Sequence, residues 1–154
     1  MSREESDAFL DGERTVICAS NGVGGWPHLM PLWYVRRPTG PGAAGEIWAW
    51  TFAKSQKARN VERDRRVTLQ VEAGEHYAEL RGVMLETEAV IHRDVETVRG
   101  VGLDVLRRYA GTASGELDDN TIAMVESQAA KRIALQFVER RRVSWDHRKL
   151  AGAY

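Results

Sequence analysis

The sequence predicts a mainly β fold with peripheral helices (α+β), arranged as an antiparallel barrel. Roughly seven stretches show the residue pattern of strands, and only three or four show helical spacing. The strands of the first half follow one another at hairpin spacing, which favours antiparallel pairing over a parallel α/β sheet. At 154 residues, the chain is long enough for a sizeable core, and we expect residues 1–154 to form a single domain.

Composition narrows the classes of function. The 22 Lys and Arg balance the 22 Asp and Glu, which gives no reason to expect a nucleic acid or a membrane surface as a partner. The single cysteine, Cys18, excludes an intrachain disulfide and a Cys-based zinc site, and the four histidines lack paired ligand spacing. No run of about 18 apolar residues is present, and the acidic start is unlike a signal peptide. We therefore expect a cytoplasmic protein without a metal site.

The first elements predict a helix followed by a hairpin. Residues 3–11 have the spacing of a short amphipathic helix, and residues 13–20 read as a β-branched strand. The Gly-rich turn 21–25 leads into a second strand, 26–36. Pro31 lies in the middle of that strand and cannot donate a ladder hydrogen bond, which predicts an edge, a bulge or an open side there.

An aromatic strand follows the hairpin. Two prolines and three glycines make 37–45 a loop, and residues 46–52 then alternate with a period of two. Trp48, Trp50 and Phe52 share one face of this strand. Beside the start of the next helix, such Trp-rich strands suit the wall of a pocket for a flat aromatic ligand, and core tryptophans at a barrel rim give the same pattern.

The central part of the chain predicts one helix and two further strands. Residues 55–64 contain good helix formers after a capping serine. Residues 66–72 and 79–92 alternate between apolar and polar side chains, as strands with one buried face do.

Helical spacing returns in the last third. Apolar residues recur at steps of three and four over 94–110, and a second helical stretch covers 119–131. Gly100 and Gly102 each cost about 1 kcal/mol inside a helix, which predicts a bend or a break there. The chain ends with two more predicted strands, 132–138 and 140–146.

The segment 51–60 contains the sharpest chemical motif. The aromatic strand delivers Thr51, and Ser55 opens the helix that follows. The unpaired N–H groups of a helix start carry partial positive charge and suit a phosphate. Cations are unfavourable at this end of a helix, so Lys54 and Lys57 indicate an anionic ligand. An ordinary capped surface helix with solvated lysines explains the same local features.

The order of elements resembles the split β-barrel, pyridoxamine 5'-phosphate oxidase-like flavin-binding superfamily over essentially the whole chain. The matching motifs are Pro31-Leu-Trp33, a Thr-x3-Ser-x-Lys-x2-Asn turn and helix from Thr51 to Asn60, and Arg66-Val67 in the next strand. The C-terminal segment 143–150 resembles the branch of actinobacteria that uses the deazaflavin coenzyme F420.

The resemblance implies an FMN-binding-like split barrel that forms a homodimer, with the cofactor at the subunit interface. It implies that the phosphate of the cofactor is bound by Thr51, Lys54, Ser55, Lys57 and Asn60. It implies that the ring of the cofactor lies along strand 28–33, against Met30, Pro31, Leu32 and Trp33. The partner subunit would contribute its C-terminal segment near Trp145.

The chain departs from the oxidases in its positive charges. Those enzymes resemble one another in an Arg and a Lys on the second strand, and residues 28–34 here contain neither. Gln56 stands in place of the middle Arg of their Ser-Arg-Lys triplet. An FMN dianion would be held less well here. A phosphodiester with a polyglutamate tail needs charge spread along a face, as Arg59, Arg63 and Arg65 could provide it.

The resemblance therefore predicts a reductase that transfers a hydride from reduced F420 to an unsaturated small molecule. The alternatives are an FMN-dependent enzyme on the same barrel and a non-catalytic cofactor carrier or haem-binding protein. Because the cofactor carries the chemistry in such enzymes, we expect no nucleophile. His28, Arg81 and His147 are the candidates to donate a proton or orient the acceptor. The sequence does not select the substrate.

Overall fold

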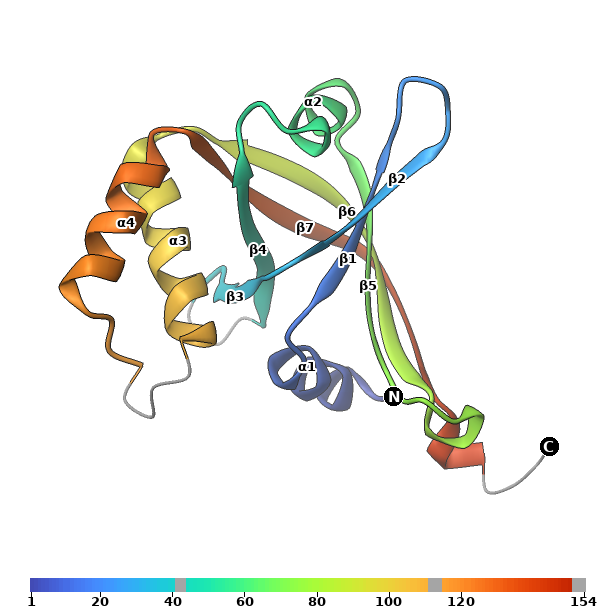
Figure 1. Ribbon diagram of the computed structural model, residues 1–154. Helices are drawn as coiled ribbons and strands as arrows, with labels where there is room; N and C mark the ends of the chain where they lie inside the picture. The colour runs from blue at the N-terminus through green and yellow to red at the C-terminus, as the bar shows by residue number, and fades with distance from the viewer. Residues whose placement is uncertain (41–43, 111–114, 151–154) are drawn as a thin grey trace.

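The computed structural model describes residues 1–40, 44–110 and 115–150 as one antiparallel sheet with helices around it (Figure 1). Its seven strands lie in the order β2-β1-β5-β6-β7-β4-β3. The strands are β1 (Val16–Asn21), β2 (Pro27–Leu32), β3 (Val35–Pro38), β4 (Gly45–Phe52), β5 (Arg66–Ala73), β6 (Arg81–His92) and β7 (Arg132–Asp146). The α-helices are α1 (Arg3–Gly12), α2 (Gln56–Arg63), α3 (Val95–Tyr109) and α4 (Asp119–Ala129), and two short 3₁₀ helices are η1 (Tyr77–Glu79) and η2 (His147–Leu150). The predicted mainly β fold is confirmed, and the sheet stays open between its edge strands.

The sheet is open where the chain passes from one edge strand, β2, to the other, β3. The single strand expected over 26–36 is wrong, because β2 ends at Leu32 and β3 begins at Val35. Between them Tyr34 is fully buried, its backbone N–H donates to Tyr109 Oη (3.1 Å), and its hydroxyl donates to the Leu10 carbonyl (2.6 Å). Side chains thus satisfy the backbone at this corner. Pro31 lies on edge strand β2, as the sequence predicts.

The core fills the inner face of the curved sheet. The alternation expected for β5 and β6 is confirmed: the side chains of their buried face are Val67, Leu69, Val71, Val83, Leu85, Thr87 and Ala89. On β4 the buried face carries Ile47, Ala49 and Thr51, and the half-buried Trp48 and Trp50 pack with α3 on the opposite side.

The sequence predicts a bend or a break at Gly100 and Gly102, and the break is wrong, because helix α3 runs without interruption from Val95 to Tyr109. The reason for a glycine here is packing: a Cβ on Gly102 would lie 2.6 Å from Cζ3 of Trp50. The missing side chain lets the indole ring approach the helix backbone.

Strand β7 also corrects the prediction, because the two strands expected at 132–138 and 140–146 are one strand, Arg132–Asp146. Glu139 lies opposite Thr87 and Arg141 lies opposite Glu86, which leaves Arg140 as the extra residue of a β-bulge. The bulge interrupts the alternation without ending the strand.

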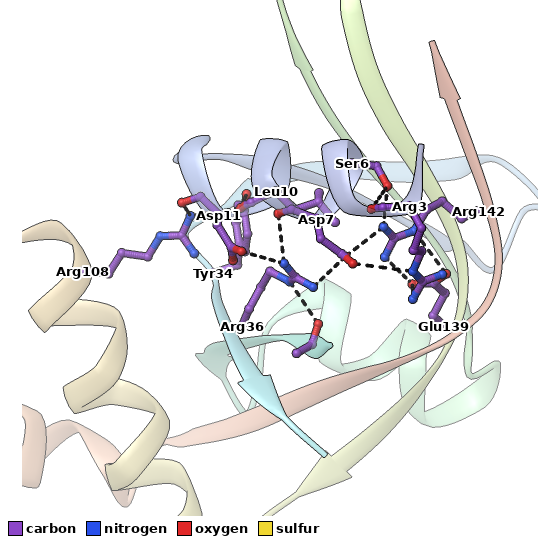
Figure 2. A network of polar contacts seen from close by, with 11 residues as sticks. Arg3, Ser6, Asp7, Leu10, Asp11, Tyr34, Arg36, Arg108, Glu139 and Arg142 are labelled. Atoms are coloured by element: carbon purple, nitrogen blue, oxygen red, sulfur yellow. Dashed lines mark hydrogen bonds and ion pairs between the residues drawn. The ribbon is translucent and has the colours of Figure 1, made fainter. Parts of the chain in front are cut away.

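A network of ion pairs holds α1 against the sheet (Figure 2). Asp7 of α1 accepts from Arg36 of β3 (2.8 Å) and from Arg142 of β7 (2.9 Å). Arg142 also donates to Glu139 (2.7 Å); burial alone would raise the pKa of Glu139, but its hydrogen bonds to Arg142 and Arg3 bring the pKa below its usual value. The network thus fixes α1, whose Leu10 carbonyl accepts the hydrogen bond from the Tyr34 hydroxyl.

No helix in the described ranges is both long and apolar enough to cross a membrane.

Candidate cofactor-binding site

Helix α2 begins directly after β4, at the end of the sheet that also carries the β1–β2 hairpin (Figure 1). Its cap is Ser55, whose hydroxyl accepts from the Ala58 N–H (3.2 Å), and the predicted capped helix is confirmed. The cap fixes the turn that joins β4 to α2, so Thr51 and the first residues of α2 lie side by side.

Lys57 is the unusual residue of this turn. Only 6% of it is exposed, and its Nζ donates to Thr51 Oγ1 (3.2 Å), which lies 3.4 Å from Ser55 Oγ. In the described part of the chain no carboxylate forms an ion pair with Lys57. Burial is the main cause that lowers its pKa. Solvated lysine is therefore the wrong interpretation for Lys57, although it holds for the exposed Lys54.

A buried ammonium with one hydroxyl partner is costly. The neighbouring thiol of Cys18 does not neutralise it, because burial raises the pKa of Cys18 to about 11. Lys57, Thr51 and Ser55 thus offer one positive charge and two hydroxyl groups around a common point. This donor set suits a phosphate or another oxyanion.

Asn60 is engaged within the protein. It is fully buried, its Nδ2 donates to Ser20 Oγ (3.1 Å), and its Oδ1 accepts from Gln56 Nε2 (2.9 Å). These contacts tie α2 to β1. The structure therefore places Asn60 behind the turn as a support for α2.

The edge strand β2 and β4 border a hollow of about 360 Å³. Its lining consists of Thr15, Pro31, Leu32, Trp33 and Trp50. Trp33 is held by stacking on Tyr109, with ring centroids 4.6 Å apart. Three of the four residues expected at a cofactor ring line this hollow. The fourth, Met30, pairs with Cys18 on the side of β1 that faces Lys57.

Arg132 is a residue of this region that the sequence analysis missed. It is the first residue of β7 and lies opposite Phe52 of β4. Its guanidinium carbon is 4.3 Å from the Trp50 ring centroid and 4.0 Å from that of Phe52. Nothing in the local sequence marks Arg132, since only the pairing of β4 with β7 brings it here.

The three catalytic candidates separate in the structure. His28 lies on β2 opposite Ser20, on the side of α2, and its buried Nδ1 has no hydrogen-bond partner among the described residues. Arg81 starts β6, 3.8 Å from Glu13, and His147 Nδ1 lies 2.9 Å from the Tyr77 carbonyl. Arg81 is the first residue of β6 and His147 follows the last residue of β7, and in Figure 1 this end of the two strands lies away from α2. Of these three candidates, only His28 lies on the side of α2 within one chain.

Trp145 lies at that far end too, opposite Gly82. A Cβ on Gly82 would be 2.2 Å from Trp145 Cζ2, so the indole covers the glycine. Trp145 is therefore remote from Lys57 within one chain.

A larger hollow of about 610 Å³ lies on the outer face of the sheet. Its arginines are already paired with acids: Arg66 contacts Asp64 (2.8 Å) and Arg140 contacts Glu88 (2.8 Å). Because its charges are compensated, this hollow has less to offer an anion than the turn at Lys57.

Comparison with known proteins identifies the family of the chain. The family profile of pyridoxamine 5'-phosphate oxidase matches residues 2–141. The chain belongs to the pyridoxamine 5'-phosphate oxidase family. A crystal structure of the conserved hypothetical protein Rv2991 from Mycobacterium tuberculosis is 41% identical, with a TM-score of 0.84 over 98% of this chain and 88% of that one.

More distant members of the fold differ in what they bind. An F420 reductase superposes with a TM-score of 0.64 at 17% identity, over 89% of this chain and 94% of that one. The haem storage protein HutZ from Vibrio cholerae superposes with a TM-score of 0.67 at 15% identity, over 94% of each chain. At such identities the likeness shows the fold alone. No curated protein matches the chain.

Proposed function

We propose that the chain is an oxidoreductase that binds coenzyme F420 and passes a hydride between reduced F420 and an unsaturated small molecule. The observation that carries the proposal is Lys57, which is buried beside two hydroxyl groups without an acidic partner in the described part of the chain. The fold of the pyridoxamine 5'-phosphate oxidase family and the likeness to an F420 reductase support the same ligand class.

The residues present fit the anionic chain of F420. Thr51, Ser55 and Lys57 would hold the phosphate, with Lys54 at the exposed rim of the turn. Arg59 and Arg65 are exposed and could accompany a glutamate tail. Spread positive charge of this kind suits a polyanionic chain better than a single compact group.

The hollow between β2 and β4 fits the ring of the cofactor. Pro31, Leu32, Trp33 and Trp50 present a mostly apolar lining, and such a lining shields a reactive ring from water. When bound, reduced F420 supplies the hydride. Among the candidates, His28 lies on the side of α2, and we assign it the role of orienting or protonating the acceptor.

A homodimer and a cytoplasmic location belong to the same proposal. The outer face of the sheet carries a row of mutually paired residues, Pro31, Ile17, Gln70, Met84 and Val143. Val143 is 37% exposed and the neighbouring Leu29 is 57% exposed. A second copy that covers this row would bury apolar surface, and it could also bring its own Trp145 toward the hollow of the first.

The test is a binding titration of the purified apo-protein, followed by tryptophan fluorescence. Trp33 and Trp50 line the hollow and will report a bound ring. We expect F420 to bind in the micromolar range or tighter, and Lys57→Ala to abolish binding. Binding of FMN without F420 would replace the proposal by the flavin-dependent alternative. Binding of haem alone would replace it by the carrier function.

A further inference from the structure

A second cation without an acidic partner lies in the same region as Lys57. No carboxylate of the described residues pairs with Arg132, and its buried Nε has no hydrogen-bond partner there. By contrast, Arg36, Arg37 and Arg142 each contact a carboxylate at 2.9 Å or less. Arg108 forms no ion pair either, but it donates to the backbone carbonyls of Leu10 and Glu13. Among the described residues, Arg132 has neither kind of partner.

Arg132 is held by two aromatic rings. Its guanidinium carbon lies 4.3 Å from the Trp50 centroid and 4.0 Å from the Phe52 centroid. Trp50 is in turn wedged against the backbone of α3 at Gly102. Contacts between a guanidinium and aromatic rings stabilise the cation without consuming its N–H donors. The rings thus position Arg132 and leave its hydrogen-bonding capacity for another partner.

The electrostatics of the two cations favour a ligand with more than one negative charge. Burial lowers the pKa of Arg132, and the charge of Arg132 further lowers the pKa of Lys57. Two like charges close together disfavour each other's charged form, and an anion between them offsets this repulsion. A ligand with a single negative charge would leave Lys57 and Arg132 with one uncompensated positive charge in a partly desolvated site.

We propose that Arg132 is a second anion-binding residue, which together with Lys57 takes a phosphate that carries or adjoins a further negative charge. The inference rests on the proposed function of the Lys57 turn as the phosphate site. Two ligands contain this chemistry: the dianionic monoester of FMN, and the phosphodiester of F420 with a carboxylate of its glutamate chain. Arg132 would supply from β7 a charge that residues 28–34 and Gln56 lack.

The experiment compares ligands with and without the charged group, using apo-protein. The probes are FMN against riboflavin, F420 against its deazaflavin chromophore without the phosphate chain, and inorganic pyrophosphate. The variants are Arg132→Gln and, as a control with the same change in net charge, Arg99→Gln, because Arg99 pairs with Glu126 on the surface of α3 and α4. We expect Arg132→Gln to weaken the phosphate-bearing ligand by about tenfold to a hundredfold, since a charge-assisted hydrogen bond is lost. Binding of the phosphate-free ring should not change, and Arg99→Gln should bind as the wild type does.

Equal binding of the phosphate-bearing ligand by Arg132→Gln and the wild type would overturn the proposal. An equal loss for the phosphate-free ring would also overturn it, because Arg132 would then act only by holding Trp50. If the Gln variant does not fold, Arg132→Met keeps the contact with both rings, removes the charge and carries the same expectation. In the wild type, pyrophosphate must raise the melting temperature, and no rise would overturn the proposal.

The same titrations separate this inference from the proposed function. A wild type that binds FMN or pyrophosphate through Arg132 but does not bind F420 would refute the F420 assignment and support the second cation. If the wild type and Arg132→Gln bind F420 equally well, the F420 assignment is supported and the second cation is refuted.

Discussion

Replacing Lys57 by methionine should stabilise the empty protein while it abolishes anion binding. Methionine nearly matches the shape of the lysine stem. It removes the ammonium group of a residue that is 6% exposed, and this group has one hydroxyl partner. Burying a polar group without full compensation costs about 1–3 kcal/mol in proteins, and the lost hydrogen bond to Thr51 returns about 1 kcal/mol. We therefore expect a net gain of up to about 2 kcal/mol from the substitution.

The expected gain is large enough to measure as a shift in melting temperature. For 154 residues the entropy of unfolding is about 0.3 kcal/mol per kelvin, so the melting temperature should rise by up to about 6 °C. The matched control is Lys54→Met, which removes an exposed charge from the same turn and should change stability by less than about 0.5 kcal/mol. A Lys57→Met protein that melts below the wild type would refute the reasoning.

The pH dependence provides a second readout of the same effect. The pKa of Lys57 is lowered in the folded protein, so between that pKa and the ordinary value of 10.5 the unfolded chain binds more protons than the folded chain. Wild-type stability must therefore rise with pH in this range relative to Lys57→Met, and the advantage of the variant must shrink. Urea unfolding of both proteins from neutral to alkaline pH measures the difference. A constant difference would contradict a desolvated Lys57.

Three further substitutions test other parts of the structure. Gly102→Ala places a Cβ where the Trp50 ring lies, and should cost about 1–3 kcal/mol by overpacking; thermal unfolding that matches the wild type would show that the ring moves freely. Tyr34→Phe removes the buried hydroxyl that donates to the Leu10 carbonyl, and should cost about 1 kcal/mol in urea unfolding; no loss would mean that water replaces the contact. Val143→Glu puts a charge in the row of paired residues on the outer face of the sheet and should convert a dimer to a monomer in light scattering; a wild-type monomer would end the dimer proposal.

Those parts of the fold that depend on short-range signals could be predicted from the sequence. The Ser55 cap, the alternation of β5 and the edge position of Pro31 each follow from the chemistry of a few consecutive residues. The errors arose where a distant contact decides. The strand expected over 26–36 is interrupted because Tyr34 is buried and hydrogen-bonds with Leu10 and Tyr109. Both partners are distant in sequence, so the residues next to Tyr34 do not indicate these contacts.

The residues of the candidate site likewise fall into those that short-range signals predict and those that depend on distant contacts. The motif at 51–60 identified Lys57 and its hydroxyl partners, because one turn contains all of them. Arg132 could not be found by spacing, since it reaches Trp50 and Phe52 only through the pairing of β4 with β7. Gly102 was misread for a related reason: helix propensity marks a glycine as a weakness, and only the packing of Trp50 shows what it permits.

The desolvation that makes Lys57 a weakness of the empty protein is also what makes it effective toward an anion. A ligand at one hundred times its dissociation constant adds about 2.7 kcal/mol to the stability of the protein that binds it. This exceeds the net cost of up to about 2 kcal/mol assigned above to the buried charge. The order of melting temperatures must therefore reverse with ligand: Lys57→Met melts above the empty wild type, and the saturated wild type melts above Lys57→Met. A lysine kept for folding alone would show no such reversal, because its removal would lower the melting temperature with and without the ligand.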